Sequence, residues 1–235
     1  MKIMNLIFFF SISISFFIYP MAENVMMGMK YEAMVTPQVL YNIDANHRDL
    51  LEQIIREAYR RDTGEGRLIA LGRIGMLNSG NRELNAVFMN MGISLTLINK
   101  DSVGIYQQLV PTVSLMQQYF NTLIRHSSGL THKIFTRMNR LFRSTLFLRA
   151  WELYQEALSL LRVPQQEQTL YMEMSVPQQA LQLITRAQAL LFHLKDTSIE
   201  ARALYDQLDT YQPVPFAREA QAMATMMTGG MMEGG

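Results

Sequence analysis

Residues 131–162 read THKIFTRMNRLFRSTLFLRAWELYQEALSLLR and contain neither glycine nor proline. Apolar residues recur along this stretch at intervals of three and four, which is the spacing of one face of an α-helix. The stretch therefore predicts one long helix near residues 131–162. Its apolar positions are Ile134, Phe135, Met138, Leu141, Phe142, Phe147, Trp151, Tyr154, Leu158 and Leu161.

The same spacing continues on the amino-terminal side of this helix. We expect a helix over residues 45–61, capped by Asp44 or Asn46 and ended by the run 62–66. Two more helices are expected to carry the apolar sets Leu68, Leu71, Ile74, Leu77 and Leu84, Val87, Phe88, Met91, Leu95. A further helix should follow over 102–126, capped by Asp101 and kinked or split by Pro111.

On the carboxyl-terminal side, two capping boxes predict two more helices. The boxes are Ser175 with Gln178, and Thr197 with Glu200. No run alternates apolar and polar residues for long enough to predict a strand. The expected fold class is all-α, a multi-helix bundle of about six or seven helices within one helical domain over 44–210. An irregular segment over 23–43 should precede this domain, and a flexible Met- and Gly-rich tail over 211–235 should follow it.

The first 22 residues have the layout of a signal peptide or an amino-terminal anchor. Lys2 precedes an apolar run from Leu6 to Tyr19, which is short for a membrane span. Ala22 would suit cleavage, but Pro20 falls where a small residue is preferred. Translation from Met21 is the alternative, and it would make the protein cytoplasmic.

The net charge of +1 hides a strong asymmetry along the chain. Residues 102–151 carry six basic side chains and no acidic one, whereas residues 152–235 carry ten acidic and five basic ones. Four of the six basic residues recur three or four apart in the long helix, which makes them a candidate partner-binding stripe. These residues are Lys133, Arg137, Arg140 and Arg143.

Three interpretations of this basic stripe compete. It could pair internally with the acidic helices that carry Asp196, Glu200, Asp206 and Asp209, and we favour this one slightly because opposite charges in one chain usually meet. It could instead be exposed for an acidic protein or an anionic membrane surface. Nucleic acid is not expected, because the net charge is close to zero.

Motifs that carry chemistry are missing from the sequence. The chain has no Cys, and it has no phosphate-binding loop, dinucleotide fingerprint, paired-histidine zinc motif or nucleophile elbow. We therefore predict no catalytic residue, no cofactor and no metal site. Paired methionines, Met226 with Met227 and Met231 with Met232, could bind Cu(I), but thioethers more often serve as adaptable apolar contacts.

These features favour a non-enzymatic, exported or envelope-associated helical protein that acts as a structural or assembly component of a larger complex through helix–helix contacts. A Gln-rich helical chain behind a signal-like start is similar in general layout to the minor pilus subunits of bacterial type IV secretion systems. That resemblance implies a secretion- or pilus-associated role. The alternative is an intracellular or virion assembly protein translated from Met21.

Export is the first testable prediction. A reporter that is active only outside the cytoplasm, fused after Glu23, should be active, because the charged start and the apolar run direct secretion. A fusion that begins at Met21 is the control and should be inactive. Equal activity of the two fusions would refute the prediction.

Overall fold

The computed structural model describes residues 43–100, 106–162 and 176–211. Of these residues, 84% are helical and none lies in a strand. The expected all-α class is thereby confirmed. The expected caps Asp101 and Ser175, the tail from 212 onward and the methionine pairs lie outside the described residues.

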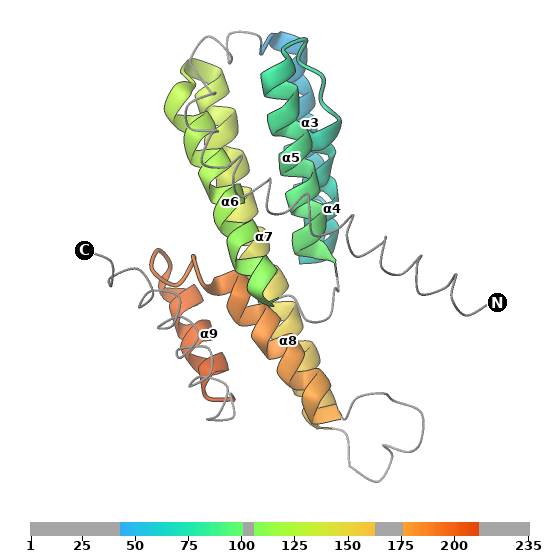
Figure 1. Cartoon of the computed structure of the whole chain (residues 1–235), viewed down its shortest axis with the longest axis vertical. Helices are drawn as coiled ribbons and strands as arrows, with labels where there is room; N and C mark the ends of the chain where they lie inside the picture. The colour runs from blue at the N-terminus through green and yellow to red at the C-terminus, as the bar shows by residue number, and fades with distance from the viewer. Residues whose placement is uncertain (1–42, 101–105, 163–175, 212–235) are drawn as a thin grey trace, which may run out of the picture. The chain divides into compact units, whose positions relative to one another are not determined.

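Seven α-helices and one 3-10 turn are described (Figure 1). They are α3 (Ala45–Tyr59), α4 (Gly64–Gly72), the 3-10 turn η1 (Arg73–Met76), α5 (Arg82–Asn99), α6 (Tyr106–His126), α7 (Gly129–Leu161), α8 (Val176–Leu191) and α9 (Ile199–Asp209). The helix α7 is the long helix that the residue pattern of 131–162 predicts.

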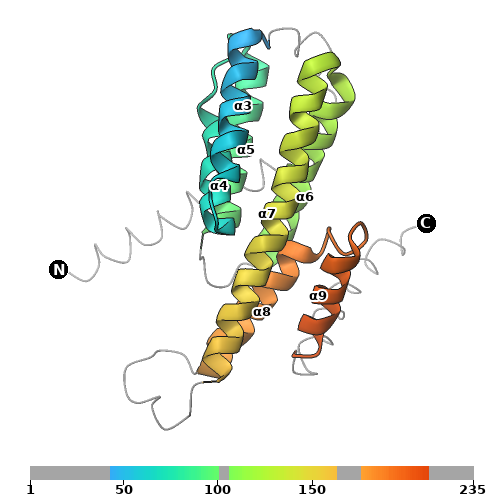
Figure 2. The ribbon, with the colours of Figure 1, turned by 180° about the vertical axis from the view of Figure 1, so that it is seen from behind.

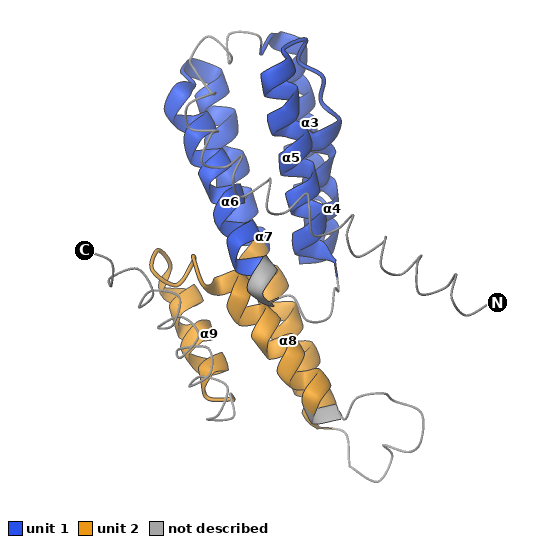
Figure 3. Cartoon of the chain, viewed as in Figure 1, with its two compact units in different colours: residues 1–145 blue, residues 146–235 orange. Residues whose placement is uncertain are grey.

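The chain divides into two compact units, residues 1–145 and residues 146–235, and the boundary falls inside α7 (Figure 3). We expected a single helical domain over 44–210, and that range holds parts of both units. Nothing in the local sequence marks the boundary, because α7 continues through it without glycine or proline.

In the first unit, α4 with η1 and α5 bury the apolar faces that their spacing predicts, whereas α3 leaves Leu50 and Tyr59 exposed. All the predicted positions of these two apolar faces are buried: Leu68, Leu71, Ile74 and Leu77 in the first, and Leu84, Val87, Phe88, Met91 and Leu95 in the second. Helix α5 packs against α4, η1 and α6, and α3 packs against α4. The rings of Phe120 and Phe142, with centroids 5.5 Å apart, join α6 to α7.

Glycines allow α5 to approach α4 and η1 more closely than side chains would permit. A Cβ atom built on Gly92 would lie 2.8 Å from the Cα atom of Gly75 and 2.9 Å from the carbonyl oxygen of Gly72. Both neighbours are backbone atoms, which cannot move aside without shifting a helix. Glycine weakens helices in general, but at position 75 it allows two backbones to come into direct contact.

Two helix ends and the effect of Pro111 differ from the expectation. Helix α3 is capped by Asp44 as predicted, but α4 already begins at Gly64, because the Thr63 side chain accepts a hydrogen bond from the Gly66 N–H. Pro111 does not split α6, since it lies within the first two turns, where little helix precedes it. The cap of α9 is Ser198 rather than Thr197, and its oxygen accepts a hydrogen bond from the Ala201 N–H.

The second unit contains the rest of α7 together with α8 and α9. Helix α8 packs on α9 around Ile184, Leu191 and Leu204, which are buried. The amide of Gln207 in α9 donates a 2.7 Å hydrogen bond to the buried Tyr154 hydroxyl in α7. Not every apolar position of α7 is buried, since Trp151 and Leu161 are each 44% exposed.

The close helix contact leads to a prediction about stability. Gly92→Ala should lower the free energy of unfolding by about 1–3 kcal/mol, because the new methyl group would overlap backbone atoms. Gly72→Ala is the matched control: a Cβ there meets nothing within 4 Å. It should leave stability unchanged or raise it by up to about 1 kcal/mol. Urea unfolding measures both, and a Gly92→Ala protein as stable as the parent would contradict the prediction.

Candidate interaction surface

The basic stripe lies in the part of α7 that belongs to the first unit. Lys133, Arg137 and Arg140 are exposed, as an accessible stripe requires. Arg143 is half-buried and makes an interaction of its own. It follows Arg137 by six residues, which turns it by about 120° around the helix. Three of the four predicted residues therefore share one exposed line.

Arg137 is paired with a carboxylate of α3. Its Nη1 donates to both carboxylate oxygens of Glu52, at 2.6 and 2.7 Å. The expected partner was a carboxylate of the acidic carboxyl-terminal helices, but the ion pair of Arg137 is made with Glu52 of the first unit. The missed partner is far away in the chain, and no sequence spacing relates Glu52 to Arg137.

Contacts within the second unit engage two of the carboxylates proposed as partners. Asp196 lies 3.7 Å from an Arg202 nitrogen, and Asp209 accepts a long 3.4 Å hydrogen bond from Gln188. These acidic side chains thus have neighbours within their own unit.

Helices α3 and α7 run in the same direction where they meet, as the colours of Figure 2 show. The contact between Glu52 and Arg137 therefore aligns the two helices turn by turn. One turn earlier lie Arg48 and Lys133, and one turn later lie Arg56 and Arg140. We call these six residues the α3–α7 basic surface: Arg48, Glu52, Arg56, Lys133, Arg137 and Arg140.

Four cations of this surface have no ion pair among the described residues: Arg48, Arg56, Lys133 and Arg140. Glu57, the next carboxylate along α3, is paired with Arg61 and Arg73 instead. Asp49 remains as an exposed carboxylate beside the surface. The surface thus carries an excess of positive charge that an anionic partner would relieve.

The outer face of α3 is also slightly hollowed. The hollow is lined by Asp49, Glu52, Gln53, Arg56, Glu57, Arg60 and Arg61. Glu52 and Arg56 belong to both the hollow and the basic surface. The hollow therefore extends the polar surface along α3.

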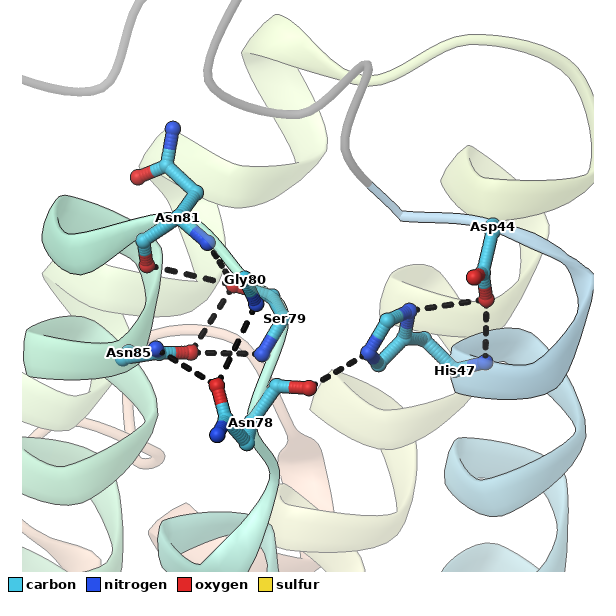
Figure 4. A network of polar contacts seen from close by, with 7 residues as sticks. All are labelled: Asp44, His47, Asn78, Ser79, Gly80, Asn81 and Asn85. Carbon is cyan, nitrogen blue, oxygen red and sulfur yellow. Dashed lines mark hydrogen bonds and ion pairs between the residues drawn. The ribbon is translucent and has the colours of Figure 1, made fainter.

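A polar network ties the start of α3 to the loop before α5 (Figure 4). The His47 Nε2 lies 2.6 Å from the carbonyl oxygen of Asn78, and its Nδ1 lies 2.8 Å from a carboxylate oxygen of Asp44. The backbone N–H of His47, which donates to that carboxylate, lowers the pKa of Asp44 below its ordinary value. The network fixes one end of α3.

The loop itself is held by amide and hydroxyl groups. The Asn85 carboxamide oxygen accepts hydrogen bonds from both the N–H and the hydroxyl of Ser79, and Asn81 caps α5. Gly80 has a φ of 70°, which glycine adopts without strain. These bonds satisfy the polar groups of a turn, so we assign this network to the fold.

An apolar strip lies exposed on α5 and beside it. Met89 and Ile93 of α5 are 54% and 44% exposed, and Ile69 and Met76, from α4 and η1, are 59% and 84% exposed. Ile93 follows Gly92 and Met76 follows Gly75, so the strip borders the glycine contact. Single exposed apolar side chains are ordinary on a protein surface, whereas neighbouring ones, such as Met89 and Ile93 one helical turn apart, occur at contact surfaces.

Two other features are absent from residues 43–100, 106–162 and 176–211. Those ranges contain no group of three or more histidine or acidic side chains placed to hold a metal ion. No helix among them is both long and apolar enough to cross a membrane. Comparison of the chain with protein-family models, with curated proteins and with solved structures yields no match.

Proposed function

We propose that the protein is a non-enzymatic assembly component of a larger complex and that it holds a partner protein through the α3–α7 basic surface. One observation carries this proposal: four cations without ion pairs, from two neighbouring helices, lie on either side of Glu52, a carboxylate that is already paired. Charge of one sign that is concentrated on a surface attracts a partner of the opposite sign and orients it.

The form of the surface favours a macromolecule over a small substrate. Its charges are spread over several helical turns, and four of its six residues are exposed, with Arg137 47% exposed even in its ion pair. Small-molecule sites, in contrast, are concave and enclose most of the ligand. The exposed apolar strip on α5 adds area of the kind that helix–helix contacts use.

The cellular location belongs to the same proposal. The signal-like start supports export to the cell envelope, and the pattern of an assembly component fits that location. The reporter fusion after Glu23 tests the location independently of the surface.

The proposal predicts that the double variant Arg56→Gln/Arg140→Gln no longer binds firmly in the native complex. In native extract, the tagged parent chain should elute from a sizing column in an assembly larger than its own 27.1 kDa. The variant should dissociate at a lower salt concentration than the parent and then elute later, as the isolated chain, because two attractive charges are gone. Its melting temperature should hardly change, since exposed charges contribute only about 0–1 kcal/mol each.

The matched control is Arg82→Gln/Arg162→Gln, which removes the same charge from two exposed arginines outside the surface. It should keep the assembly. Arg137 is left unchanged, because its loss would also leave Glu52 without its partner. If the surface variant assembles like the parent, or if both variants dissociate alike, the surface does not hold the partner.

A further inference from the structure

We infer that the α3–α7 basic surface binds an acidic α-helix that carries carboxylates two turns apart and no charge on the turn between them. This inference rests on the function proposed above and adds the chemistry of the partner. It follows from the order of charges along the two helices.

The surface has three levels. Arg48 and Lys133 form the first level, where the neighbouring Asp49 reduces but does not cancel the positive charge, and Arg56 and Arg140 form the third. At the middle level Glu52 neutralises Arg137. Because eight residues of one helix separate Arg48 from Arg56, the positive levels lie about 12 Å apart. The order along the surface is positive, neutral, positive.

A partner helix that lies along α3 and α7 can match this order. Residues seven or eight apart in a helix share one face and lie about 10–12 Å apart along its axis. Carboxylates at these two positions would each meet a positive level. A carboxylate midway between them would face Glu52, and like charges at such contacts lower affinity. The Glu52–Arg137 pair therefore selects an uncharged residue there.

The same order argues against a uniform polyanion. Each strand of a nucleic acid duplex carries one phosphate for every 3.4 Å or so of its axis, so some phosphates would meet Glu52. The headgroups of an anionic membrane also form a continuous negative layer. An acidic helix can leave out the middle charge, and we therefore favour it over both.

Two synthetic alanine-rich helical peptides test this inference. The split peptide has two Glu eight residues apart with Gln midway, and the filled peptide has Glu at all three positions. Fluorescence anisotropy of each labelled peptide, titrated with the full chain at low salt, gives the affinities. The parent should bind the split peptide about three- to five-fold more tightly, although the filled peptide has more negative charge.

Two variants make the test specific to this surface. Glu52→Gln removes the middle carboxylate and releases Arg137, so the filled peptide should become the tighter ligand. Arg56→Gln/Arg140→Gln should lower the affinity for the split peptide several-fold, whereas Arg82→Gln/Arg162→Gln should not change it. Circular dichroism confirms that each variant is folded.

The inference is overturned if the parent binds the filled peptide more tightly, or if duplex DNA or anionic vesicles bind better than the split peptide. Such results, together with loss of the native complex in Arg56→Gln/Arg140→Gln, would leave the assembly function standing with a different partner. If the parent prefers the split peptide and Arg56→Gln/Arg140→Gln weakens its binding but keeps the native complex, the acidic helix is supported and the assembly function of this surface is refuted.

Discussion

The contact of Gly92 with the backbone of Gly72 and Gly75 is the tightest constraint in the first unit. It brings α5 directly against α4 and η1, with no side chain between the backbones. Helix α3 packs on α4, and α6 packs on α5, so the positions of both depend on this contact. Helix α7 follows through its aromatic contact with α6. The neighbourhood of α3 and α7 is thus a consequence of core packing.

The pair of Glu52 and Arg137 indicates how α3 and α7 are aligned, but it does not cause that alignment. Both side chains are partly open to water, at 22% and 47%, and an ion pair of this kind contributes only about 0–1 kcal/mol. Its importance lies in the arrangement of charge. It neutralises the middle of a surface whose two ends remain positive, and this turns a general basic patch into a patterned one.

Much of the fold follows from local patterns, and the site follows only in part. Three- and four-residue spacing predicts each helix, because amphipathic helices must bury one face. It also places Lys133, Arg137 and Arg140 on one line of α7. The contribution of Arg48, Glu52 and Arg56 could not be predicted, since which helix lies beside α7 depends on packing between distant segments.

The number of acidic residues in each part of the chain favoured the carboxyl-terminal helices as partners of the basic stripe. Such a count does not indicate which helices lie next to each other in the fold. The cap of α9 was missed by one residue because Thr197 and Ser198 can both cap a helix, and only the backbone geometry decides between them.

The parallel alignment of α3 and α7 is the claim on which the surface depends, and cross-linking tests it most directly. The chain has no cysteine, so a pair that is introduced on the surface is the only pair present. A short bismaleimide cross-linker can compare two such pairs. The first is Arg56→Cys with Arg140→Cys, and the second is Arg56→Cys with Lys133→Cys. In the parallel alignment the first pair shares a level, whereas the second is separated by about 10 Å along the helices. The account predicts much faster cross-linking of Arg56→Cys with Arg140→Cys. Faster cross-linking of Arg56→Cys with Lys133→Cys would show that the helices are not aligned in this way, and it would contradict the account.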